Sequence, residues 1–179
     1  MTQLTFGAVA DLGGSWSPDG TTIVFSRAAK DASGIYTMNA DGTHVRRVVP
    51  LSIDETEQHP SWSPDGSRVA FTGYTSRISA PQNDPQFDPG LDFTGSIGIF
   101  VAHADGSHVA QLSPDTGRYF EGSPAWSPDG TKIVFECGGI CTMGADGSDR
   151  VRITRSPTNP FDDFVYPSWG TSPITLPSP

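Results

Sequence analysis

Trp126-Ser127-Pro128-Asp129-Gly130 is the most informative stretch of this chain, because the same five residues also stand at Trp16–Gly20 and at Trp62–Gly66. Trp is a rare residue, so three copies of one pentapeptide headed by it do not arise by chance. A second motif, Ala-Asp-Gly followed by Ser or Thr, begins at Ala40, Ala104 and Ala145. The chain is therefore a tandem array, in which each period builds one structural unit.

The order Pro, Asp, Gly within the pentapeptide is typical of a type I turn. Pro presets φ, Asp hydrogen-bonds its own backbone, and Gly accepts a positive φ. Residues 132–136 then predict a strand because they are β-branched and aromatic, and further strands are expected over 140–143 and 150–154. One repeat is thus expected to be a four-stranded antiparallel meander. The structural turn residues are Pro18, Asp19, Gly20, Pro64, Asp65, Gly66, Pro128, Asp129 and Gly130.

The second strand of each repeat is apolar without alternation, as in Ile133-Val134-Phe135. A strand that is apolar on both sides is buried on both faces of its sheet. Sheets stacked face to face around an axis, as in the blades of a β-propeller, produce this pattern. No long stretch has helical periodicity, so the sequence indicates an all-β fold.

At these residues the chain resembles the TolB-type propellers, also called PD40 or WD40-like repeats. The resemblance rests on Pro-x-Trp-Ser-Pro-Asp-Gly, on the run Ile35–Gly42, and on Gln3-Leu4-Thr5, which matches the end of a fourth strand. It implies a partial β-propeller of three four-stranded antiparallel blades, flanked by single strands from neighbouring blades.

The repeats divide the chain as a single partial propeller over residues 1–179. We expect a stray outer strand at 2–6, blades at 9–49, 50–113 (with an insert at 74–95) and 114–155, and the start of an incomplete blade with a tail at 156–179. Members of the resembled family usually have six or seven blades. Two copies of the chain could therefore close a six-bladed ring as a homodimer, or the chain could be a piece of a longer protein.

The net charge of −9 limits the partners of the chain. It disfavours nucleic acid and anionic membranes, and it suits cationic partners or metal ions. No apolar stretch approaches membrane-spanning length. The resemblance implies a periplasmic or extracellular location, whereas no signal peptide follows Met1, so a cytoplasmic location stays open.

Counting back five residues from each Trp gives Asp11, Glu57 and Glu121. In the resembled fold this segment lies at the mouth of the central channel, where three carboxylates could bind a divalent cation or a basic peptide. The alternative is a set of solvated loop acids without a partner. No other cofactor is expected.

Two pairs of side chains leave alternatives open. Cys137 and Cys141 could form a disulfide if a three-residue loop separates their strands, and could not with a two-residue loop. His103 and His108 flank one Asp-Gly turn and could bind a transition metal together, although two exposed histidines on a hairpin are more often only surface residues.

The chain has no nucleophile elbow, phosphate loop or dinucleotide fingerprint. We therefore expect no enzyme and no catalytic residue, but an interaction module that binds a protein or peptide through its channel-mouth loops. One alternative is a scaffolding or gating part of a larger hydrolase, peptidase or lyase. Another is cation or carbohydrate binding at the acidic channel ring.

Overall fold

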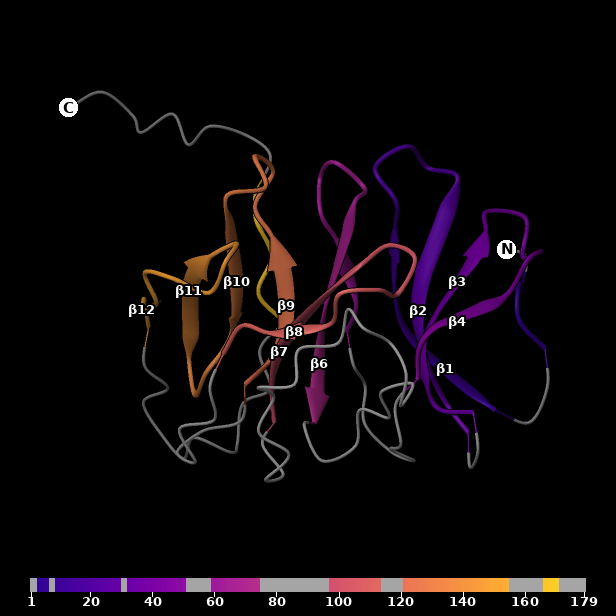
Figure 1. Ribbon diagram of the computed structural model, residues 1–179, viewed down its shortest axis with the longest axis horizontal. Coiled ribbons are helices and arrows are strands. Elements are labelled where there is room, and N and C mark those ends of the chain that lie inside the picture. The colour runs from indigo at the N-terminus through magenta and orange to yellow at the C-terminus, as the bar shows by residue number, and fades with distance from the viewer. Residues whose placement is uncertain are drawn as a thin grey trace.

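A computed structural model of the chain describes residues 3–6, 9–29, 32–50, 59–74, 97–113, 121–154 and 166–170. These residues form three four-stranded antiparallel sheets, and no helix occurs in the described ranges. The prediction of an all-β partial propeller with three four-stranded blades is confirmed (Figure 1). The insert expected at 74–95 lies outside the described residues, except for its first residue.

Each sheet follows the order of its strands in the chain. The first blade contains β1 (Ala10–Trp16), β2 (Thr22–Ala28), β3 (Gly34–Asn39) and β4 (Arg46–Pro50). The second contains β5 (Ser61–Trp62), β6 (Arg68–Tyr74), β7 (Ile97–His103) and β8 (Ala110–Gln111). The third contains β9 (Gly122–Trp126), β10 (Lys132–Glu136), β11 (Ile140–Gly144) and β12 (Val151–Arg152). Each blade is therefore a meander of sequential hairpins.

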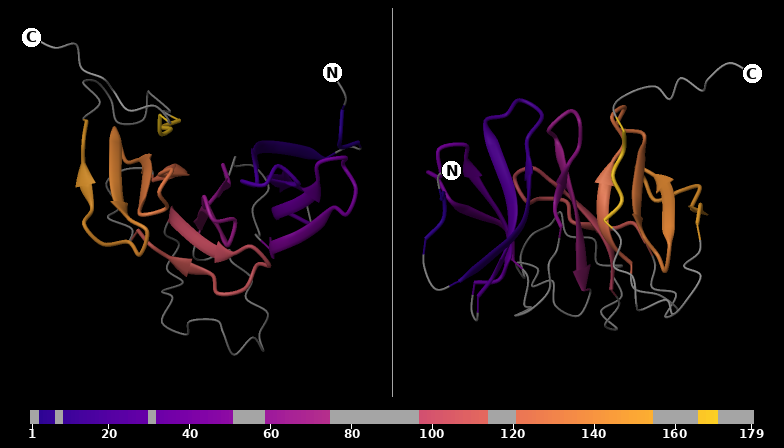
Figure 2. Two further views of the ribbon diagram at one scale, coloured as in Figure 1. Left: turned by 90° about the horizontal axis from the view of Figure 1, so that it is seen from above. Right: turned by 180° about the vertical axis from the view of Figure 1, so that it is seen from behind.

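The three sheets stand side by side along an arc (Figure 2). The first strands β1, β5 and β9 lie on the concave side of this arc, and the fourth strands lie on its convex side (Figure 2). This arrangement is that of consecutive propeller blades, whose first strands line the central channel.

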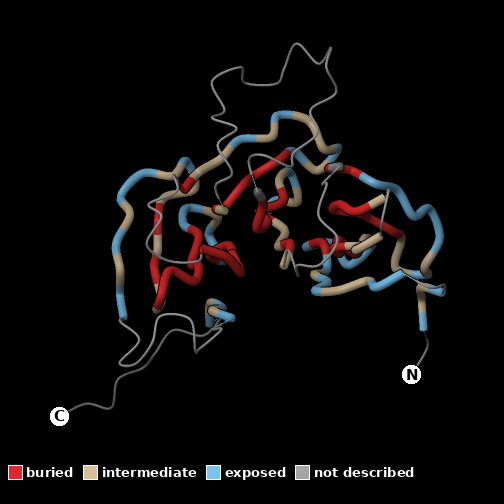
Figure 3. Tube along the Cα trace, turned by 90° about the horizontal axis from the view of Figure 1, so that it is seen from below, coloured by how far each residue is buried: buried red, intermediate tan, exposed pale blue. Residues whose placement is uncertain are grey.

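The core fills the spaces between neighbouring sheets, where Figure 3 shows the buried residues. Val69 and Phe71 of the second blade pack with Val24 and Ile35 of the first. Ala70, which alternates with them along β6, belongs instead to the cluster that includes Phe135 of the third blade. The middle sheet is therefore apolar on both faces, which explains why its second strand does not alternate.

The three Trp-Ser-Pro-Asp-Gly turns have the same geometry. In each, the Ser hydroxyl donates to the Asp carboxylate at 2.6 Å and accepts a hydrogen bond at 2.9 Å from the N–H of the first residue of the next strand. The Gly has a φ of 70° in all three, as predicted. The hydroxyl of Ser63 is the main cause that lowers the pKa of Asp65 to about 2, and Ser127 does the same for Asp129.

Neighbouring blades meet closely at the glycine of each Ala-Asp-Gly turn. A Cβ placed on Gly106 would lie 1.9 Å from the carbonyl oxygen of Val48 in the first blade, and one on Gly147 would lie 2.8 Å from that of Leu112 in the second. Gly42 of the first blade faces the carbonyl oxygen of Leu4 in the same way, at 2.9 Å. Leu4 thus stands where a preceding blade would place its fourth strand.

Candidate functional site

Asp11 lies on β1, directly opposite Arg27 of β2. Its two carboxylate oxygens accept hydrogen bonds from Arg27 Nε at 2.6 Å and Arg27 Nη2 at 2.8 Å. The hydrogen bond to Asp11 is the main cause that raises the pKa of Arg27 above its usual value. The same guanidinium lies 4.8 Å from the ring of Tyr36, so Asp11 is held in a planar, stacked ion pair.

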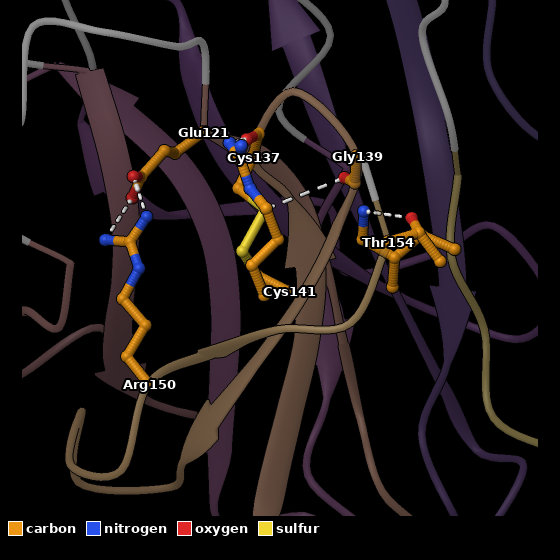
Figure 4. Close-up of a disulfide and its surroundings, with 8 residues drawn as sticks. Glu121, Cys137, Gly139, Cys141, Arg150 and Thr154 are labelled. Carbon is orange, nitrogen blue, oxygen red and sulfur yellow. Dashed lines mark hydrogen bonds and ion pairs between the residues drawn. A yellow bond between two sulfur atoms is a disulfide. The ribbon is translucent and has the colours of Figure 1, made fainter. Parts of the chain in front are cut away.

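Glu121 stands at the equivalent position just before β9 and is only 1% exposed. Its carboxylate pairs with Arg150, whose Nη1 donates to Oε2 at 3.2 Å and whose Nη2 donates to Oε1 (Figure 4). The Arg150 guanidinium also lies 5.2 Å from the ring of Phe135. A buried carboxylate needs such a partner, because an unpaired charge in the core is costly.

Of the three carboxylates expected at the channel mouth, the structure describes two, and Glu57 lies outside the described residues. Asp11 and Glu121 do not stand free: each is neutralised by an arginine of its own blade. Within the described ranges, no group of three or more His, Cys, Asp or Glu side chains could hold a metal ion. Asp11 and Glu121 therefore act as ion pairs within their blades, and neither is a free ligand for a cation.

A different position, three residues before each Trp, is irregular in all three blades. Gly13, His59 and Ser123 have positive φ values of 48°, 41° and 53°. The ladder register shifts next to this position in the first and third blades, between Leu12 and Ser15 on β1 and between Val134 and Glu136 on β10. A bulge of this kind redirects a side chain at the edge of a sheet.

Gly13 of the first blade and His59 of the second lie next to each other on the concave side, and the segment 166–170 packs against His59. The ring of Tyr166, which is 60% exposed, lies 4.7 Å from that of His59. A Cβ on Gly13 would lie 3.3 Å from His59 Nδ1. The Nε1–H of Trp169 donates to the carbonyl of Ala125 at 3.1 Å and ties this segment to β9. Counting back three residues from each Trp, instead of five, gives Gly13 and His59 of this cluster, but not Tyr166 or Trp169.

Cys137 and Cys141 are joined by a disulfide with a Cα–Cα distance of 5.9 Å (Figure 4). Glu136 pairs with Ile140 and Phe135 with Cys141, so Cys137 lies in the loop and does not face Cys141. The expectation that only cysteines in register could bond is therefore wrong, because the loop conformation brings Cys137 to Cys141. Both cysteines are buried in the cluster between the second and third blades. The disulfide therefore fixes the β10–β11 hairpin of the third blade, close to the Glu121–Arg150 ion pair (Figure 4).

No helix within the described ranges is long and apolar enough to cross a membrane.

The fold and the repeated contacts define the class of protein: a β-propeller scaffold built from tandem blades.

No family model matches the chain. A TolB homologue of Chlorobium luteolum is 34% identical over 149 residues, which cover 69% of this chain and 33% of the homologue. A structure assigned to TolB of Agrobacterium tumefaciens superposes with a TM-score of 0.62 at 22% identity, over 83% of this chain and 50% of that one. The chain belongs to the TolB-like β-propeller family.

Some proteins that share this fold are enzymes. The uncharacterized peptidase YuxL of Bacillus subtilis is 29% identical over 138 residues, 67% of this chain and 20% of the peptidase. An oligogalacturonate lyase of Vibrio parahaemolyticus superposes with a TM-score of 0.58 at 14% identity, over 86% of this chain and 43% of the lyase. The chain spans between 20% and 42% of the length of three curated relatives that it matches.

Proposed function

We propose that the chain is a non-enzymatic propeller module that binds a protein or peptide partner on the concave side of its arc. The observation that carries this proposal is the exposed ring of Tyr166, which packs on His59 where the first two blades and segment 166–170 meet. Tyr offers a large, rigid, apolar face with a hydroxyl at its tip, and it is enriched at protein interfaces for that reason.

The charge of the chain adds a preference for the partner. A net charge of −9 favours a basic or neutral partner over an acidic one. Because Asp11 and Glu121 are already paired with arginines, we expect the contact energy to come from the aromatic cluster, and the charge to act mainly on the association rate.

Selection of peptides from a random displayed library against the chain tests the proposal. Peptides that bind should lose at least about tenfold in affinity for Tyr166→Ala, because an aromatic residue at the centre of an interface contributes most of its energy. Val151→Ala, an exposed apolar residue on the outer strand β12, is the control and should leave the affinity unchanged. Selected peptides that ignore Tyr166, or that depend equally on Val151, would overturn the proposed surface.

A second candidate function is an accessory role, in which the blades scaffold or gate a catalytic domain. It is favoured by the match to YuxL, where the similar part is 20% of the peptidase. In that case the isolated chain should bind the catalytic domain or its substrate but turn nothing over. Peptide or oligogalacturonate cleavage that copurifies with the chain through size exclusion would show that the chain itself is an enzyme.

We further propose that the chain works in an oxidising compartment such as the periplasm or the extracellular space. The Cys137–Cys141 disulfide supports this location, since structural disulfides persist there and are rare in the cytosol. Thiol labelling of the protein in intact cells tests it: the two cysteines should resist labelling until a reductant is added, and immediate labelling would contradict the proposal.

A second copy of the chain is one partner that the first blade could take, closing a six-bladed ring. Trp16 is 56% exposed, whereas Trp126, at the same repeat position, is 6% exposed against the second blade. The exposed Trp16 therefore stands at a position that a further blade would cover. Light scattering at micromolar concentration should show a dimer that Trp16→Ser weakens, and a monomer for both would refute the closure.

A further inference from the structure

The hairpin between β7 and β8 of the second blade places two imidazole rings against each other. His103 is the last residue of β7, and His108 follows the Asp105-Gly106 turn. Their ring centroids are 4.3 Å apart with an interplanar angle of 32°. Both residues are exposed, so an ion in solution can reach the rings. This site lies on the hairpin end of the second blade and contains none of the residues of the concave aromatic cluster.

The Ser107 hydroxyl lies at the edge of the ring pair and contacts the Nδ1 atom of both rings. Its hydroxyl donates to Asp105 Oδ1 at 2.7 Å, so its one proton is already used. The same Oγ lies 3.1 Å from His108 Nδ1 and 3.4 Å from His103 Nδ1. With the hydroxyl proton directed at Asp105, the oxygen has lone pairs to offer, and this arrangement favours an Nδ1–H donor on each ring.

This hydrogen-bond network favours the tautomer that leaves Nε2 free to bind a metal. A neutral imidazole with its proton on Nδ1 carries its free lone pair on Nε2. Metal-binding histidines in proteins are commonly oriented in this way, with the second ring nitrogen donating to an oxygen. The Asp105 carboxylate lies in the same turn, hydrogen-bonded to the Ser107 hydroxyl that contacts both rings, so it is an acidic group close to the proposed ligands.

We propose that His103 and His108 form a surface site for one divalent transition-metal ion of the Zn²⁺, Cu²⁺ or Ni²⁺ type, bound through the two Nε2 atoms. Imidazole nitrogen is a preferred ligand for these ions. The protein supplies two ligands, so the remaining coordination positions are open to water or to a donor group of a partner.

The other two blades show why the site belongs to the second one. The first blade has one imidazole in the equivalent hairpin, His44, and Asn39 stands in place of the second; Asn39 Nδ2 lies 2.9 Å from His44 Nδ1. The third blade has Gly144 and Asp149 at the two positions and no imidazole. His44, His108 and Asp149 share nearly the same backbone conformation, with φ values of 55°, 52° and 50°. The equivalent hairpins of the first and third blades therefore have the same backbone shape, but carry one imidazole and no imidazole, respectively.

Titration of the purified chain with Zn²⁺ in a calorimeter tests the proposal, with Cu²⁺ electron paramagnetic resonance as a second measurement. We expect one ion per chain, and spectra that show two coordinated imidazole nitrogens. His103→Asn and His108→Asn should each weaken binding by more than about tenfold, and Ser107→Ala, which loosens the rings without removing a ligand, by about tenfold.

His44→Asn is the matched control and should leave the binding isotherm unchanged. Because the three histidines are exposed, we expect all variants to keep the circular dichroism spectrum of the parent chain. The proposal is overturned if His44→Asn weakens binding as much as His108→Asn, if neither His103→Asn nor His108→Asn changes it, or if the copper spectrum shows fewer than two imidazole nitrogens.

Discussion

Replacing Gly106 by Ala tests how tightly the blades are stacked, and Gly20 provides a matched control. Both glycines are left-handed, with φ values of 90° and 70°. An L-residue in that region costs about 1–2 kcal/mol, and the loss of unfolded-state freedom returns about 0.4–1 kcal/mol of it. Backbone strain alone therefore predicts a net loss of about 1 kcal/mol at either position.

The two positions differ in what surrounds the new methyl group. Nothing lies within 4 Å of a Cβ on Gly20, whereas a Cβ on Gly106 would stand 1.9 Å from the carbonyl oxygen of Val48. The second-blade hairpin would have to move away from the first blade by about 1 Å or more. Overpacking of this kind adds about 1–3 kcal/mol, so we expect a total loss near 3 kcal/mol for Gly106→Ala.

Urea and thermal unfolding followed by Trp fluorescence separate these outcomes. For a domain of this size, 1 kcal/mol corresponds to about 2–4 °C in Tm. Gly106→Ala should therefore lower Tm by about 6–12 °C, and Gly20→Ala by about 2–4 °C, with little change in the urea m-value. Equal losses for the two variants would refute the reasoning, because the hairpin of the second blade would then not be seated against the first.

Four further variants test the disulfide, one of the turns and the two ion pairs. Replacing both Cys137 and Cys141 by Ser should lower the unfolding free energy by about 2 kcal/mol, the value expected for a short closed loop; no change on adding reductant to the parent chain would contradict this. The folded-state pKa of Asp65 is lowered from 3.8 to about 2, so its contribution to stability is present above about pH 4 and is lost as the pH falls toward 2. Asp65→Asn should flatten that part of the stability profile, and an unchanged profile would argue against the turn contact. Glu121→Gln should cost about 2 kcal/mol because it leaves Arg150 without its buried partner, whereas Asp11→Asn, at a carboxylate that is 13% exposed against 2% for Glu121, should cost less than about 1 kcal/mol; the reverse order in urea unfolding would refute the burial argument.

The turns and blades were predictable because their chemistry is local. Ser, Pro, Asp and Gly stand within five residues of each other, and the hydrogen bonds that they make close within the same turn. Likewise, the unalternating run Ile133-Val134-Phe135 predicts burial on both faces, which the clusters on either side of the middle sheet explain.

The environment of the candidate carboxylates was not predictable in the same way. Counting from Trp gives the right repeat position for Asp11 and Glu121, but their partners Arg27 and Arg150 are 16 and 29 residues away. Only the strand register shows that Asp11 and Arg27 face each other. A sequence pattern that repeats shows which residues share an environment, and it does not show what that environment contains.

The positive φ at His59 and Ser123 illustrates the same limit from the backbone. Both residues adopt a positive φ that non-glycine residues seldom take, so neither residue type announces the irregularity. Only Gly13, at the same repeat position, is a residue that favours it.

The contacts between blades define what a neighbour of the first blade must supply. Within the chain, two groups of each blade contact glycines of the next blade. The turn proline lies beside the glycine of the next Pro-Asp-Gly turn, and a carbonyl at the fourth strand lies beside the glycine of the next Ala-Asp-Gly turn. A Cβ placed on Gly66 would lie 3.7 Å from the Pro18 ring, and one placed on Gly130 would lie 3.6 Å from the Pro64 ring. At the first blade Leu4 provides the carbonyl beside Gly42, but Gly20 has no neighbour within 4 Å and Trp16 remains exposed. The open face is therefore half completed: its outer part is covered by residues 3–6, and its inner part still matches the Pro-Asp-Gly turn of another blade. The same two contacts recur at both junctions inside the chain. A neighbour that completes this face would therefore have to place a turn proline beside Gly20, as each blade does for the next one.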